Sequence, residues 1–88
     1  MYLSIGPNTV VPASSIVGIY DMDTAIASKH TRALFKAHED AGRVIALFDD
    51  IPKSFVHCVE GGESVLYLSQ LSTATLLRRS GLEFGVQR

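Results

Sequence analysis

The order of apolar and polar residues predicts strands on both sides of one long helix. Before the helix, short apolar and β-branched runs predict strands over residues 2–5 and 16–20. A further extended stretch covers residues 9–11. The segment Gly6-Pro7-Asn8 separates residues 2–5 from residues 9–11, because glycine, proline and asparagine favour turns.

Residues 24–41 are good helix formers, and Gly42 follows them as a stop signal. Asp21, Asp23 and Ser28 all have side chains suited to cap the start of this helix. One apolar stripe at helical spacing runs along it and is expected to face the core. The stripe consists of Ile26, His30, Ala33, Leu34, Ala37 and Ala41.

Three strands and a short helix follow. The strands are expected at 44–48, 55–59 and 65–68, with turns at 49–52 and 60–63. The pair Gly61-Gly62 suits a tight hairpin, since primed turns need positive φ. A helix at 74–79 begins after Ser72 or Thr73 and ends before Gly81.

These elements together predict one α+β domain over residues 1–80 with a small, antiparallel-rich sheet. The expected order is β-β-α-β-β-β-α, with one long and one short helix. Residues 81–88 form a C-terminal tail without a clear pattern, for which disorder is one expectation.

The three later strands carry apolar residues on both faces. In 44–48, 55–59 and 65–68 there is little of the alternation that leaves one face of an antiparallel sheet in water. Two short helices can cover one face of such a sheet but hardly both. A sheet face left uncovered would expose a contiguous apolar surface, and such a surface usually marks a protein interface. We therefore expect a homo-oligomer.

Composition narrows the function. The chain has 88 residues, a formal net charge of −1 and a single cysteine, Cys58. Its pI of about 6.2 is too low for nucleic-acid binding through bulk charge, so such binding needs a local patch. Prolines and glycines interrupt the N-terminal apolar run, which disfavours a secretory signal, and no run approaches the roughly 20 apolar residues of a membrane span. A reduced, cytoplasmic setting without membrane contact is the simplest interpretation.

Catalytic and metal-binding patterns are weak. His57 and Cys58 are neighbours in a predicted strand, so their side chains point to opposite faces and a structural role is favoured. The pair Ser14-Ser15 has neither a neighbouring histidine nor a glycine elbow, and Asp49-Asp50 is typical of a solvated turn. We therefore expect no enzyme activity, catalytic residue, metal, cofactor or small-molecule substrate.

Basic residues give more support for phosphate binding. Three of them share a face of the long helix, and the others lie at element ends or turns. The candidate phosphate contacts are Lys29, Arg32, Lys36, Arg43, Lys53, Arg78 and Arg79. The alternative is an ordinary solvated basic face, because helical pairing and the helix dipole also explain several of these positions. An assembly would repeat a weak patch and gain avidity.

Several segments resemble a known family. The opening "MYLSIG…VV…SIVGIYD", the central "PKSFV" and the closing "LYLSQLSTATLLRR" are similar to the RemA/RemB family of bacterial extracellular-matrix regulators, and most similar to the RemB type. The resemblance covers about residues 1–80 and is weakest through the first helix. It implies a fold like the LytTR type of DNA-binding domain, ring-like homo-oligomers, and binding of double-stranded DNA that activates biofilm-matrix genes.

The resemblance also implies where DNA contacts would lie. RemA-like members use an arginine before the second strand and arginines in the turn before the fourth. The matching positions here are Ser14 or Ser15 and the turn 49–53, in which Lys53 is the basic residue. Two hypotheses stay open: an oligomeric DNA-binding regulator that also uses the basic stripe of the helix, and a homo-oligomeric scaffold without DNA binding.

Overall fold

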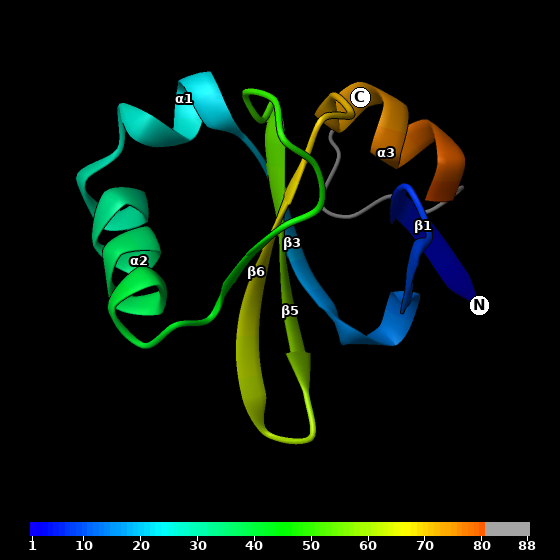
Figure 1. The fold of residues 1–88 in the computed structure, drawn as a ribbon, viewed down its shortest axis with the longest axis horizontal. Coiled ribbons are helices and arrows are strands. Elements are labelled where there is room, and N and C mark those ends of the chain that lie inside the picture. The colour runs from blue at the N-terminus through cyan, green and yellow to red at the C-terminus, as the bar shows by residue number, and fades with distance from the viewer. Residues whose placement is uncertain (81–88) are drawn as a thin grey trace.

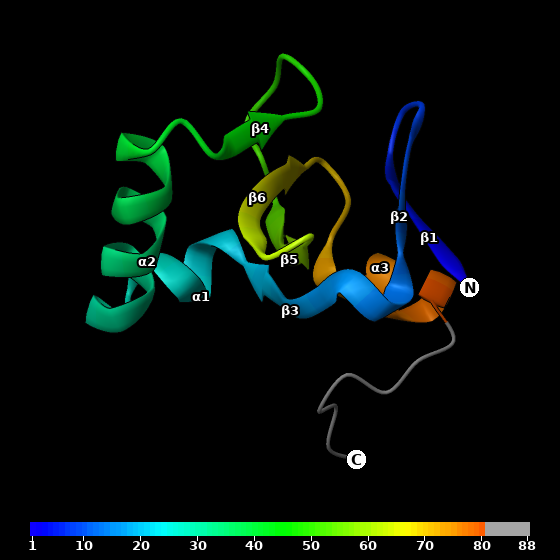
Figure 2. The ribbon, with the colours of Figure 1, turned by 90° about the horizontal axis from the view of Figure 1, so that it is seen from below.

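A four-stranded sheet lies between a helical layer and a second layer built from a β-hairpin and a helix (Figure 1). The computed structural model describes residues 1–80, so the tail of 81–88 lies outside the described residues. In Figure 2 the two outer layers again lie on opposite sides of the sheet. The α+β class that the sequence predicts is confirmed.

The helices lie between two groups of strands and after the second group. The strands are β1 (Tyr2–Gly6), β2 (Thr9–Pro12), β3 (Ile16–Asp21), β4 (Val44–Ala46), β5 (Ser54–Glu60) and β6 (Glu63–Ser69). The helices are a 3-10 turn (Ala13–Ser15), α1 (Met22–Ile26), α2 (Lys29–Asp40) and α3 (Thr73–Ser80). Within the described part of the chain, no helix is long and apolar enough to cross a bilayer.

The sheet is mixed. Its order is β3-β5-β6-β4, and β4 runs parallel to β6 while the other pairs are antiparallel. The glycines at 61 and 62 have φ of 58° and 82°, as the predicted tight hairpin between β5 and β6 requires. The element order differs from the predicted one, because three strands and two α-helices, rather than two strands and one helix, precede β4.

Successive residues of the two central strands enter different cores. Phe55 and Leu66 are buried beneath the helices, whereas Val56 and Cys58 are buried beneath the hairpin and α3. The chain therefore covers both faces of β5 and β6 itself. The expectation that these apolar strands need a second copy for cover is wrong for β5 and β6. Apolar side chains of these strands stay exposed at the edge strand β4, where Ile45 is 43% exposed, and at the end of β5, where Val59 is 40% exposed.

The predicted long helix is two helices. Ser28 has extended backbone angles, φ −91° and ψ 126°, and interrupts the helix. The N–H of Thr24 donates to Asp21 Oδ2 at 3.0 Å, and that of Thr31 donates to Ser28 Oγ at 3.3 Å. Two of the three predicted caps are thus used, one for each helix.

The face of α2 that meets the sheet is not the predicted apolar stripe. Thr31, Leu34, Phe35 and His38 are half-buried at helical spacing, whereas most of the predicted stripe is exposed. Phe35 packs edge-on against Phe55, with ring centroids 5.7 Å apart. One large aromatic contact outweighs several alanines in setting how the helix rotates about its axis.

Buried hydroxyls fasten the hairpin layer to the sheet. Ser69 Oγ donates to the carbonyl of Ile5 at 2.6 Å and accepts from the N–H of Leu71 at 3.0 Å. Ser54 Oγ donates to the carbonyl of Leu71 at 2.7 Å. Both serines are fully buried, so these bonds satisfy polar groups that water cannot reach.

Replacing Val56 by alanine tests whether the chain covers the hairpin-side face by itself. Val56 is 0% exposed, and Val59 on the same strand is 40% exposed. We expect Val56→Ala to lower the free energy of unfolding by about 2 kcal/mol, since it leaves a cavity, and Val59→Ala to lower it by less than about 1 kcal/mol. Urea unfolding monitored by circular dichroism at dilute protein concentration measures both. Equal costs for the two variants would contradict the buried position of Val56.

Candidate nucleic-acid interface

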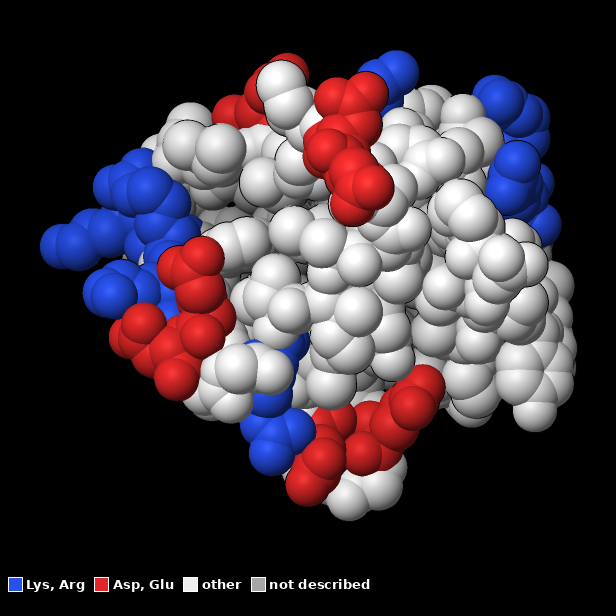
Figure 3. Space-filling view, viewed as in Figure 1, with Lys and Arg blue, Asp and Glu red and all other residues white. Residues whose placement is uncertain are grey.

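The basic residues of α2 lie on its exposed side. Lys29, Arg32 and Lys36 are exposed and follow one another at helical spacing. Figure 3 shows blue surface gathered over α2 at one end of the molecule. The local sequence places them there, because Phe35 and His38 turn the other side of α2 toward the sheet.

Two of these three cations already have partners in the chain. Lys36 Nζ forms an exposed ion pair with Asp40 at 3.3 Å. Arg32 Nη1 donates to the carbonyl of Ile26, at the end of α1, at 2.6 Å. Lys29 forms no ion pair among residues 1–80. An exposed pair such as Lys36–Asp40 contributes only about 0.5 kcal/mol, so it competes weakly with a phosphate for the lysine.

Arg43 forms an ion pair with Glu63, at the turn between β5 and β6. Its Nη1 donates to Glu63 Oε1 at 3.1 Å, and this contact lowers the pKa of the Glu63 carboxyl. The two residues are 20 positions apart and meet because β4 pairs with β6. The pair neutralises Arg43 locally and makes it the least available of the predicted phosphate contacts.

Lys53 lies in acidic surroundings. It lines a cleft of about 480 Å³ together with Asp21, Asp23 and Asp50. Its backbone holds the strands in register, since its N–H donates to the carbonyl of Ser69 at 2.9 Å. Three carboxylates around one lysine repel a DNA phosphate, so the turn that the resemblance assigns to DNA contact is electrostatically unfavourable here.

Arg78 and Arg79 form a second basic group in the last turn of α3. Both are exposed, and Arg78 Nη2 donates to Thr75 Oγ1 at 3.4 Å. In Figure 3 the blue surface over α3 lies opposite that over α2, with white and red surface between them. The seven predicted contacts therefore form separate groups in one subunit rather than one continuous belt.

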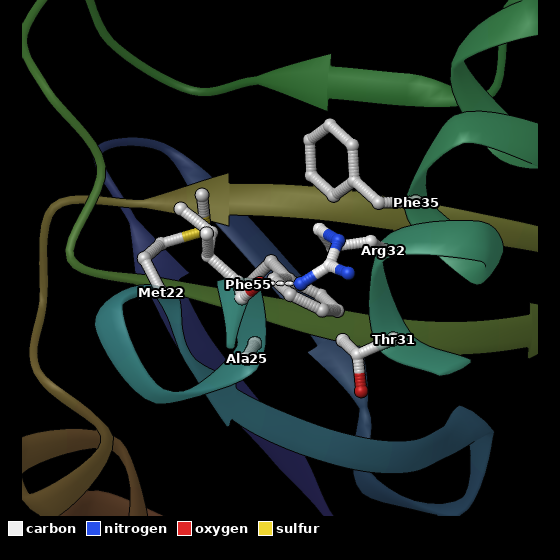
Figure 4. Close-up of a pocket in the computed structure, with 7 residues that line it drawn as sticks. Met22, Ala25, Thr31, Arg32, Phe35 and Phe55 are labelled. Atoms are coloured by element: carbon white, nitrogen blue, oxygen red, sulfur yellow. Dashed lines mark hydrogen bonds between the residues drawn. The ribbon is translucent and has the colours of Figure 1, made fainter. Parts of the chain in front are cut away.

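A pocket opens between the two helices of the helical layer. It has a volume of about 220 Å³ and is lined by residues of α1, α2 and β5. Figure 4 shows Phe35 and Phe55 beside it, with the guanidinium of Arg32 extended across it toward α1. Sequence reasoning missed this pocket, because it exists only where the expected single helix is broken.

A second feature that sequence reasoning missed is a histidine–serine–histidine cluster. His38 Nε2 and His57 Nε2 lie 2.7 and 2.6 Å from Ser64 Oγ. His38 Nδ1 lies 2.8 Å from the carbonyl of Leu34, which can only accept, so Nδ1 carries the proton. Neutral rings then satisfy every contact: His57 donates to Ser64, and Ser64 donates to His38. The residues come from three elements, and no sequence spacing signals their meeting.

The neighbours His57 and Cys58 point to opposite faces, as predicted. His57 joins the cluster with Ser64, while Cys58 is buried in the hairpin-side core. Burial, and secondarily the nearby His38, lower the pKa of His57. Burial raises the pKa of the Cys58 thiol, which keeps it protonated and unreactive. Among residues 1–80, no three potential ligands of the His, Cys, Asp or Glu type come together around a metal position.

The lowered pKa of His57 predicts a pH dependence of stability. The unfolded chain takes up a proton near pH 6.5, whereas folded His57 stays neutral to lower pH. The unfolded state therefore binds more protons in this window, and the free energy of unfolding falls as the pH drops below 6.5. Urea unfolding from neutral pH to about pH 5 measures the slope.

The matched variant is His57→Gln, whose amide can still donate to Ser64 but does not titrate. We expect it to have a shallower slope than the original protein over the same window. Identical slopes would show that other groups cause the dependence.

Comparison with protein-family models gives no match to this chain, and comparison with curated proteins gives none either.

Proposed function

We propose that the protein is a cytoplasmic, homo-oligomeric DNA-binding regulator of biofilm and extracellular-matrix genes, of the kind that its RemA/RemB-like segments suggest. Its affinity for double-stranded DNA comes from repeated contacts of lysine and arginine with phosphates. Such contacts position a protein on a duplex without reading its sequence.

One observation carries the proposal: exposed cations that no carboxylate of the described chain holds lie at both ends of the subunit. Lys29 on α2 and Arg78 and Arg79 on α3 form no ion pair within residues 1–80. Lys36 adds a fourth cation, since its exposed pair with Asp40 is weak. Assembly of several subunits would bring such groups together and repeat them along the duplex.

Open strand edges support self-association. β3 and β4 are the outer strands of the four-stranded sheet, and each has one neighbouring strand in the described chain. Unpaired edge strands are templates for pairing with another chain. A contact between two different edges repeats from subunit to subunit and closes into a ring when the rotation allows it.

The combined substitution of Lys29 and Lys36 by glutamine tests the phosphate contacts. We expect Lys29→Gln/Lys36→Gln to weaken binding of a fluorescently labelled duplex. It should also make the dependence of log K on log salt shallower by about 0.9 for each phosphate that the variant no longer neutralises. Fluorescence anisotropy at several salt concentrations measures both effects.

The control is Arg43→Gln/Lys53→Gln, which removes the same number of positive charges at sites already balanced by carboxylates. We expect it to change the salt slope less than the lysine pair of α2. A larger effect of the control would show that DNA contacts Arg43 and Lys53 rather than the lysines of α2.

A second candidate function is a homo-oligomeric scaffold that binds another protein. The resemblance places DNA contact at the turn of Lys53, and the carboxylates around that lysine repel phosphate. This observation favours a scaffold. A scaffold would self-associate and yet show no duplex binding even at low salt. The anisotropy titration separates the two functions.

A further inference from the structure

The turn between β4 and β5 presents an unusual side chain. Ile51 is 82% exposed, and the two residues before it, Asp49 and Asp50, are exposed carboxylates. Asp50 Oδ1 accepts from the N–H of Ile51 at 2.7 Å, which fixes the shape of the turn. The turn therefore displays an exposed apolar side chain that two carboxylates directly precede.

The pocket between α1 and α2 has the complementary properties. Met22, Ala25 and Ile26 line it from α1, and the rings of Phe35 and Phe55 lie beside them (Figure 4). Its volume of about 220 Å³ exceeds the ~150 Å³ of a cavity that accepts benzene, so a branched aliphatic side chain fits.

Arg32 gives this apolar pocket a positive mouth. Its Nη1 donates to the carbonyl of Ile26, and its Nε and Nη2 form no hydrogen bond or ion pair within residues 1–80. Figure 4 shows the guanidinium reaching across the pocket. A guest that fills the pocket and also carries a carboxylate would satisfy both parts of the site.

We propose that this pocket is a self-association site, in which Ile51 of a second copy enters between α1 and α2 while Asp49 and Asp50 of that copy face Arg32. The inference rests on the self-association that the proposed function includes. Charge complementarity selects the occupant. Of the large exposed apolar residues of the described chain, Ile51 is the one preceded by two carboxylates. The docking also explains why the turn carries Asp49 and Asp50, which phosphate binding does not explain.

The first test removes the apolar side chain of Ile51. Ile51→Ser changes a side chain that is exposed in the single subunit, so the fold should be preserved, and Val10→Ser, at a residue 57% exposed on β2, is the matched control. In sedimentation velocity of the full chain, we expect Ile51→Ser to dissociate at a protein concentration at least about tenfold higher than the original protein. Val10→Ser should behave like the original protein. An unchanged Ile51→Ser, or equal dissociation of both variants, would overturn the inference.

The second test exchanges charges. Asp49→Lys and Arg32→Glu should each weaken association, and the double variant Asp49→Lys/Arg32→Glu should regain at least part of it, because the ion pair re-forms with reversed sign. A double variant no better than the weaker single variant would reject the contact. Because Arg32→Glu removes the bond to the Ile26 carbonyl, circular dichroism must show that it still folds, and Asp49→Lys alone tests the contact with the pocket intact.

Duplex binding of the same samples separates the two proposals. If Ile51→Ser stays assembled and still binds DNA, the docking site is wrong and the proposed function stands. If Ile51→Ser dissociates but the original protein binds no duplex at low salt, the docking site is right and DNA binding is wrong. A monomeric original protein at high concentration would overturn the docking site together with the assembly in the proposed function.

Discussion

The structure depends on placing β5 and β6 at the centre of a sheet that the chain itself covers on both sides. Phe55 and Val56 are neighbours in sequence, yet they belong to two separate cores. Such a strand cannot lie at an edge or face water, so the helices and the hairpin must occupy opposite faces. The buried hydroxyl of Ser69 then joins the hairpin layer to the sheet through the Ile5 carbonyl. The apolar side chains that stay exposed, Ile51 and Val10 among them, therefore lie outside the two cores that this sheet organises.

Local signals in the sequence identified the caps and the tight turn, but not the break of the long helix at Ser28. Asp21 and Ser28 are caps, and the glycine pair makes the hairpin turn, because each depends on one residue and its immediate neighbours. The parallel pairing of β4 was not predictable, since it depends on contacts between distant segments. The predicted stripe on α2 failed for a related reason: Phe35 occupies the buried side through a ring contact with β5 that periodicity does not contain.

The same distinction explains the candidate site. The sequence identifies which side chains are basic, but their availability depends on partners that only the fold supplies. Lys36 and Asp40 are four residues apart and could be paired from spacing alone, whereas Arg43 and Glu63 meet through the sheet. Lys53 is basic, but the fold places it in a cleft lined by three aspartates. The histidine cluster around Ser64 likewise joins three elements and leaves no sequence pattern.

The break in the helix connects the fold to the proposed docking site. In a continuous helix the carbonyl of Ile26 would accept from the N–H of residue 30, and no pocket could form between consecutive turns. Ser28 ends that continuity, so the chain changes direction and the Arg32 side chain donates to the same carbonyl instead. One guanidinium thus replaces a backbone donor and places positive charge at the mouth of the apolar space that the break creates. Arg32, which helical spacing predicts as a phosphate contact, thus also lines the pocket that we propose as the docking site for the acidic turn.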